Sequence, residues 1–204
     1  MPTGAASLVA EAIDGLLGTL PGVSGEQEAL REAVTRWQQL RPSARVTGSR
    51  GMRLFRLDEL AVPDVPGFAR RATKADLDLL RAWYVAFSAD ADADHSRRRA
   101  EHAVPSARPG RLRAVGGRRT APVVGRLHPV VAGVARIGPV YTPDEHRRHG
   151  CGAAVTATAS QAARHGTACE VVLFTDLGNP TSNKIYTQIG FRPLGDYLEV
   201  STTG

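Results

Sequence analysis

The order of elements between residues 134 and 191 constrains the fold more than any other feature of the chain. A strand pattern at 130–142 precedes the glycine turn Arg147–Ala153 (Arg-Arg-His-Gly-Cys-Gly-Ala), which opens a helix pattern rich in small residues. Residues 168–175, rich in Val, Leu and Phe, have the profile of a buried parallel strand. A crossover of about 25 residues between two strands predicts a right-handed parallel pair. An α/β fold is therefore expected.

The rest of the sequence predicts a smaller N-terminal part joined to a main domain. Pro and Gly cluster in the connector Ala61–Gly67, and such clusters are typical of domain boundaries. We therefore expect a small α+β appendage at 1–62 and a main domain at 68–204. The other expected elements are helices at 5–18 and 25–39, a helix capped by Thr73, a helix at Pro180–Gln188, and strands at 52–57, 111–115, 123–127 and 191–200.

Composition and motifs exclude several classes of protein. No apolar run approaches the ~20 residues that span a bilayer, and Glu11 and Asp14 interrupt the apolar start, which argues against a secretory signal. The two cysteines, Cys151 and Cys169, imply no disulfide framework, and neither Cys-x-x-Cys nor His-Glu-x-x-His occurs. A cytoplasmic protein with no membrane segment and no metal is expected.

The positive charge of the chain is concentrated in one segment. The formal net charge is +6, but nine arginines and one acid, Glu101, lie between Arg97 and Arg126, which gives +8 there and −2 elsewhere. Aromatic residues, on which unpaired bases stack, are absent from this segment. Nucleic acid is therefore not an expected partner.

The glycine turn has the chemistry of an anion site. The first N–H groups of a helix have no internal acceptor, and Gly150 and Gly152 carry no side chain that would keep an anion away from them. A P-loop would need Gly-Lys-Ser/Thr, which is absent. A dinucleotide turn would need its glycines directly after the strand, whereas residues 143–149 intervene here, so that interpretation is disfavoured.

The pattern Arg147-x-x-Gly150-x-Gly152 resembles the acetyl-CoA loop of the Gcn5-related N-acetyltransferase (GNAT) superfamily, in its uncharacterised predicted-acetyltransferase subgroup. The resemblance covers about 130–200 strongly. It implies a GNAT fold, a mixed central sheet flanked by helices, with splayed fourth and fifth strands. Acetyl-CoA would be the acyl donor, held by Val140, Tyr141, Thr142, Arg147, Arg148, His149, Gly150, Cys151, Gly152, Ala153, Asn179 and Ser182.

A second pattern, Asn179-x-x-Ser182-x-x-x-Tyr186 followed by Gly190-Phe191, resembles the other signature of the superfamily. Asn179, Ser182 and Tyr186 share one face of a helix by their spacing. The resemblance implies that Tyr186 is the catalytic residue, a general acid that protonates the departing CoA thiolate. A phenol suits that role because it is neutral at pH 7.

The resemblance implies that a primary amine, carried by a small molecule or a peptide, directly attacks the thioester carbonyl of acetyl-CoA. The general base is open between His128, Glu145 and water. A monomer or a homodimer is expected. The resemblance to this subgroup implies an N-terminal half longer than the one present here. Residues 1–60 resemble the end of such a half, so we expect this half to be truncated.

Two alternatives stay open. The first is a catalytically defective acyl-CoA-binding protein, because residues 97–128 resemble a shifted reading frame of GC-rich DNA where the superfamily builds substrate-facing strands. The second is a nucleic-acid-binding module that uses the arginine segment, for which binding would fall steeply with salt.

Overall fold

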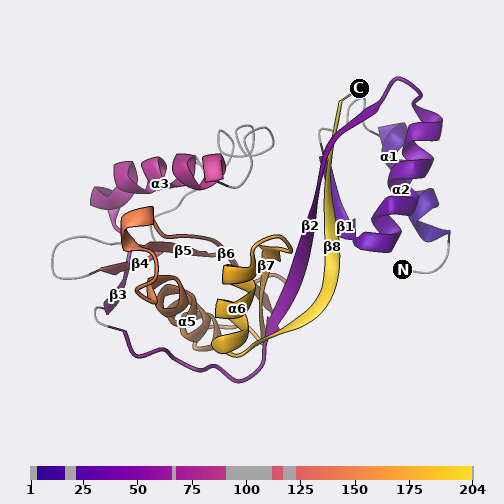
Figure 1. Ribbon diagram of the computed structural model, residues 1–204. Coiled ribbons are helices and arrows are strands. Elements are labelled where there is room, and N and C mark those ends of the chain that lie inside the picture. Colours follow the sequence, from indigo (N-terminus) through magenta and orange to yellow (C-terminus); the bar gives the residue numbers. More distant parts are fainter. Residues whose placement is uncertain (1–3, 17–21, 66–67, 91–111, 117–122, 204) are drawn as a thin grey trace. The chain divides into compact units, whose positions relative to one another are not determined.

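The computed structural model describes residues 4–16, 22–65, 68–90, 112–116 and 123–203 (Figure 1). The chain forms two compact units. The terminal unit comprises residues 1–54, 175–180 and 194–204, and the central unit comprises residues 55–174 and 181–193. The predicted domain limits, 1–62 and 68–204, stay a prediction. Much of the arginine segment, residues 97–111 and 117–122, lies outside the described residues.

The terminal unit combines two helices with three strands. Helices α1 (Ala5–Leu16) and α2 (Gln27–Leu40) pack on each other, with Ala10 and Trp37 buried between them. Strand β1 (Gly22–Glu26) runs antiparallel to β8 (Phe191–Thr203), and β8 pairs in turn with β2 (Arg45–Leu57). The two helices agree with the sequence, whereas β1 was not expected and β2 is longer than predicted.

The central unit contains a mixed sheet in the order β7-β6-β5-β4-β3. Among the four pairs of these five described strands, β6 and β7 are parallel and the others are antiparallel. This arrangement confirms the predicted α/β class and the parallel pair. The strands are β3 (Phe68–Arg71), β4 (Leu112–Gly116), β5 (Val123–Leu127), β6 (Val134–Tyr141) and β7 (Glu170–Asp176).

Helices cover both faces of this sheet. Helix α3 (Leu77–Asp90) lies on one face, and α5 (Cys151–Arg164) and α6 (Pro180–Gln188) lie on the other (Figure 1). Two short 3-10 turns, Lys74–Asp76 and Asp144–His146, precede α3 and α5 respectively. The small residues of α5 form its buried face, which lets the helix approach the sheet closely.

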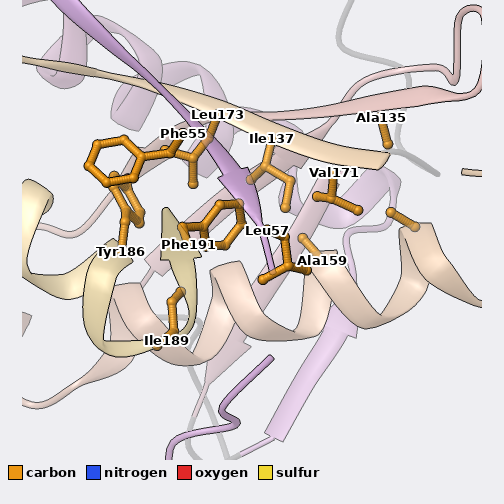
Figure 2. Close-up of a cluster of buried hydrophobic side chains, with 11 residues drawn as sticks. Phe55, Leu57, Ala135, Ile137, Ala159, Val171, Leu173, Tyr186, Ile189 and Phe191 are labelled. Atoms are coloured by element: carbon orange, nitrogen blue, oxygen red, sulfur yellow. The ribbon is translucent and has the colours of Figure 1, made fainter. Parts of the chain in front are cut away.

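The core of the central unit is one apolar cluster between the sheet and α5 and α6 (Figure 2). Alternating positions of β6 and β7 supply Ala135, Ile137, Val171 and Leu173, as expected for strands whose side chains point to opposite faces. The remaining buried members are Phe55, Leu57, Ala159, Ala163, Tyr186, Ile189 and Phe191. Tyr186 thus belongs to the core as well as to the candidate site.

Strands β6 and β7 part before β6 ends. Their parallel pairing runs from Val134–Glu170 to Ile137–Leu173, and no further pairs join the two strands. Strand β6 continues to Tyr141 on its other side, where it pairs with β5. Among the described strands, the pairing of β6 with β7 thus ends at Ile137, whereas its pairing with β5 reaches Tyr141.

Candidate functional site

The glycine turn is exposed and leads directly into α5. Gly150 is the residue before the helix, and its φ of +75° lies in the left-handed region that favours glycine. The first bond inside the helix is from Ala154 N–H to Gly150 O, at 3.0 Å. The N–H groups of Cys151, Gly152 and Ala153 therefore precede the internal ladder, and no side chain caps them.

Arg147 fixes the approach to the turn. Its Nε donates to Thr142 O at 3.0 Å, and its Nη1 lies 2.8 Å from Asp144 Oδ1. Arg148, with a φ of +66°, and His149 are exposed beside it. All three basic residues are exposed, but Arg147 is held in place by its contacts with Thr142 and Asp144 of the same loop.

The structure brings the end of β6 next to the start of α5. Val140 and Cys151 pack against the same buried pair, Val123 and Val155. A Cβ on Gly152 would lie 3.6 Å from Thr142 Oγ1. The turn is therefore adjacent to the segment of β6 that has left β7. Val140, Tyr141, Thr142, Cys151, Gly152 and Ala153 are all half-buried.

Tyr186 lies on the inner side of α6, where the residue is 9% exposed. The ring centroid is 6.3 Å from that of Phe55 and 6.2 Å from that of Phe191, in edge-on geometry (Figure 2). Burial raises the pKa of the Tyr186 phenol to about 12, because the phenolate would be desolvated. The hydroxyl is therefore neutral over the whole physiological range.

The other residues of the tyrosine helix lie in different surroundings. Ser182 is half-buried in the central unit. Asn179 is exposed and belongs to the terminal unit, where its N–H donates to Asp176 O at 3.1 Å. The structure therefore brings Val140–Thr142 and Arg147–Ala153 together within the central unit, and the role of Asn179 stays a prediction.

The two candidate bases differ in their contacts. A ring nitrogen of His128, Nε2, lies 2.7 Å from Gly138 O, so this nitrogen is engaged by the backbone of β6. Glu145 is exposed in the 3-10 turn before α5. Neither contact assigns a base.

Sequence reasoning missed one segment that touches the site. The connector after β2 places Val65 against Gly150 and Glu59 against Gly190. Its proline content indicated a linker, and no periodicity in it predicted packing. The two glycines that it contacts were the available signal, since both follow or precede a helix at a point where the chain must turn.

The described residues contain no cluster of three or more His, Cys, Asp or Glu side chains that could hold a metal ion. Within the same residues, no helix combines the length and the apolar character needed to cross a membrane.

Comparison with known proteins shows which solved structures share this fold. The FR47-like protein family matches residues 121–199. No curated protein matches the chain. A GNAT-family protein from Novosphingobium aromaticivorans is 17% identical, with a TM-score of 0.65, and the match covers 98% of this chain and 80% of that one. A GCN5-related N-acetyltransferase from Kribbella flavida is 20% identical, with a TM-score of 0.62 and coverages of 90% and 68%.

A third solved structure, an acetyltransferase of the GNAT family from Colwellia psychrerythraea, is 12% identical over 98% of this chain and 71% of that one, with a TM-score of 0.62. At such identities the solved structures establish the shared fold, and the sequence match falls on the segment that carries both signature patterns. Residues 121–199 are thus similar to the FR47-like family, and the chain shares its fold with these GNAT structures.

Proposed function

We propose that the protein transfers an acetyl group from acetyl-CoA to a primary amine by direct attack. One observation carries the proposal: the amides that open α5, which have no side-chain cap, lie beside the part of β6 that lies beyond its last pair with β7. An elongated ligand that carries an anionic group next to an extended polar arm fits such a site. The amides and the helix dipole attract the anion, and the strand offers hydrogen bonds to the arm. Cytoplasmic location and a monomeric or homodimeric state remain predictions.

The residues present suit acetyl-CoA. The amides of Cys151, Gly152 and Ala153 would hold the diphosphate, with Arg148 adding positive charge and His149 offering a ring N–H donor. The segment of β6 beyond its last pair with β7, Ile137–Leu173, would lie along the pantetheine arm, as a strand does beside an added strand. Bound acetyl-CoA supplies an activated thioester whose carbonyl carbon the amine attacks.

We propose that the Tyr186 hydroxyl donates to the sulfur of CoA as it departs. A phenol with a pKa of about 12 is a poor donor to a free thiolate, whose pKa is about 8.5, since full transfer would be uphill by about 5 kcal/mol. The hydroxyl therefore acts first as a hydrogen-bond donor to the sulfur as charge develops there. Complete protonation by Tyr186 requires that the bound ligand lower the pKa of its phenol.

The test is release of CoA from acetyl-CoA in the presence of a panel of primary amines. The Tyr186→Phe variant keeps the ring and its aromatic contacts but loses the donor, so kcat should fall about 10²–10⁴-fold with unchanged affinity for acetyl-CoA. Tyr84→Phe, on α3, is the matched control and should retain the wild-type rate. Full turnover by Tyr186→Phe would reject the proton-donor role.

Burial of Tyr186 also favours a second candidate, an acyl-CoA-binding protein that does not turn over. This protein would bind acetyl-CoA through the same turn and strand edge. It would release no CoA with any amine, and Tyr186→Phe would then change neither binding nor rate.

A further inference from the structure

The connector between β2 and β3 is packed against the tyrosine helix. It runs from Asp58 to Val65 past α6 and α5 on its way to β3 (Figure 1). Asp58 N–H donates to Gly190 O at 3.0 Å, and Ala61 N–H donates to Ile189 O at 3.2 Å. These two bonds tie the first half of the connector to the end of α6.

The same segment is fixed to the core and to α5. Leu60 packs against the apolar cluster of the central unit. The guanidinium of Arg164, in the last turn of α5, donates to Asp58 O. The connector therefore contacts the two helices that carry the candidate site, and it is not a free linker.

The far end of the connector reaches the glycine turn. A Cβ on Gly150 would lie 2.6 Å from Val65 Cγ1, a distance that real Cβ atoms do not tolerate. Val65 is half-buried, whereas Gly150 stays exposed. The valine therefore covers one flank of Gly150 and leaves another open to solvent.

We propose that the connector, through Val65, is a positioning segment for the diphosphate-binding turn. The turn needs left-handed backbone at Arg148 and Gly150, and a rigid neighbour on one flank limits its alternatives. Binding then costs less ordering, since the amides are already aimed. The inference rests on the proposed function, because it assigns a role in holding acetyl-CoA at that turn.

The experiment measures the dissociation constant of CoA by calorimetry and the melting temperature for each full-length variant. Val65→Ala should weaken CoA binding about fivefold, while Val65→Ile, which keeps Cγ1, should restore it. Val62→Ala is the matched control, because Val62 lies in the same connector and is 58% exposed. It should bind CoA as the wild type does.

A second variant approaches the contact from the other side. Gly150→Ala forces a Cβ toward Val65, so the double variant Gly150→Ala, Val65→Ala should bind CoA more tightly than Gly150→Ala alone. This comparison holds even where Val65→Ala lowers the melting temperature.

The outcomes separate the two proposals. Equal CoA affinity for Val65→Ala and Val62→Ala, at whatever melting temperature, would overturn the positioning role and leave the proposed function standing. If the two substitutions have additive effects on the free energy of CoA binding in the double variant, the positioning role of Val65 is overturned as well. An absence of CoA binding in the wild type would overturn both.

Discussion

Substitution of Gly190 by alanine probes how the connector and the tyrosine helix depend on each other. Gly190 has a φ of +98°, and a Cβ built on it would lie 1.7 Å from Glu59 O. Because that neighbour is backbone, it cannot rotate away as a side chain would. The connector must move, and two of its bonds to the end of α6, to Gly190 O and Ile189 O, would then break.

The loss in free energy of unfolding can be estimated from these contacts. A left-handed conformation costs an L-residue about 1–2 kcal/mol. Loss of two backbone hydrogen bonds costs about 1–3 kcal/mol more. The free energy of unfolding should therefore fall by about 2–5 kcal/mol, which for a chain of this size lowers the melting temperature by about 4–20 °C.

Thermal and urea unfolding followed by circular dichroism measures this loss. Gly195→Ala is the control, since Gly195 has no left-handed φ and the nearest atom to its Cβ position, in Tyr197, is 4.0 Å away. That variant should differ from the wild type by about 0.5 kcal/mol or less. A Gly190→Ala protein that unfolds within 1 kcal/mol of the wild type would refute the described docking of the connector.

Three further predictions concern titration and loop order. Since the pKa of Tyr186 is raised from 10.0 to about 12, the unfolded chain releases this proton first between those values, so stability should fall by about 3 kcal/mol over that range, and Tyr186→Phe should remove the slope in alkaline unfolding. Arg70 holds the pKa of Asp76 well below its ordinary value, so this contribution is present above about pH 4 and is lost as pH falls. Asp76→Asn should flatten the acid limb of urea unfolding and cost about 1 kcal/mol at pH 7 through the weakened cap at Thr73. Arg147→Ala, which frees Thr142 O, should raise the dissociation constant of acetyl-CoA with little change in melting temperature, and equal affinity would contradict the account of the turn.

Much of the central unit could be predicted from the sequence because its signals are local. The strand at 170–176 contains the apolar run Val171–Phe174, and the helix at 151–164 begins after glycine and has small residues on its buried face. A parallel pair follows from the crossover alone. The glycine turn could be placed at the start of α5 for the same reason.

Other features depend on contacts that no local pattern encodes. Strand β1, Gly22–Glu26, is short and rich in glycine, and pairing with β8 stabilises it as a strand. The connector packs through two glycines far along the chain, Gly150 and Gly190, so its proline content alone predicted a linker. The spacing placed Tyr186 on the face of the site residues, but it is also buried in the core.

The point at which β6 and β7 separate also escaped prediction in detail. The strand pattern at 130–142 gave no sign of where pairing with β7 would end, and the last pair, Ile137 with Leu173, is known only from the structure. That separation is what would admit a ligand, so the candidate site was better defined by the fold than by its motifs.

The most direct test is a calorimetric titration of the wild-type protein with acetyl-CoA, with NAD and ATP titrated under the same conditions. If the amides of residues 151–153 hold the diphosphate of a thioester carrier, acetyl-CoA should bind at a single site and CoA should compete for it. NAD and ATP should give much weaker binding or none. No heat with acetyl-CoA, or binding of NAD as tight as that of acetyl-CoA, would contradict the account.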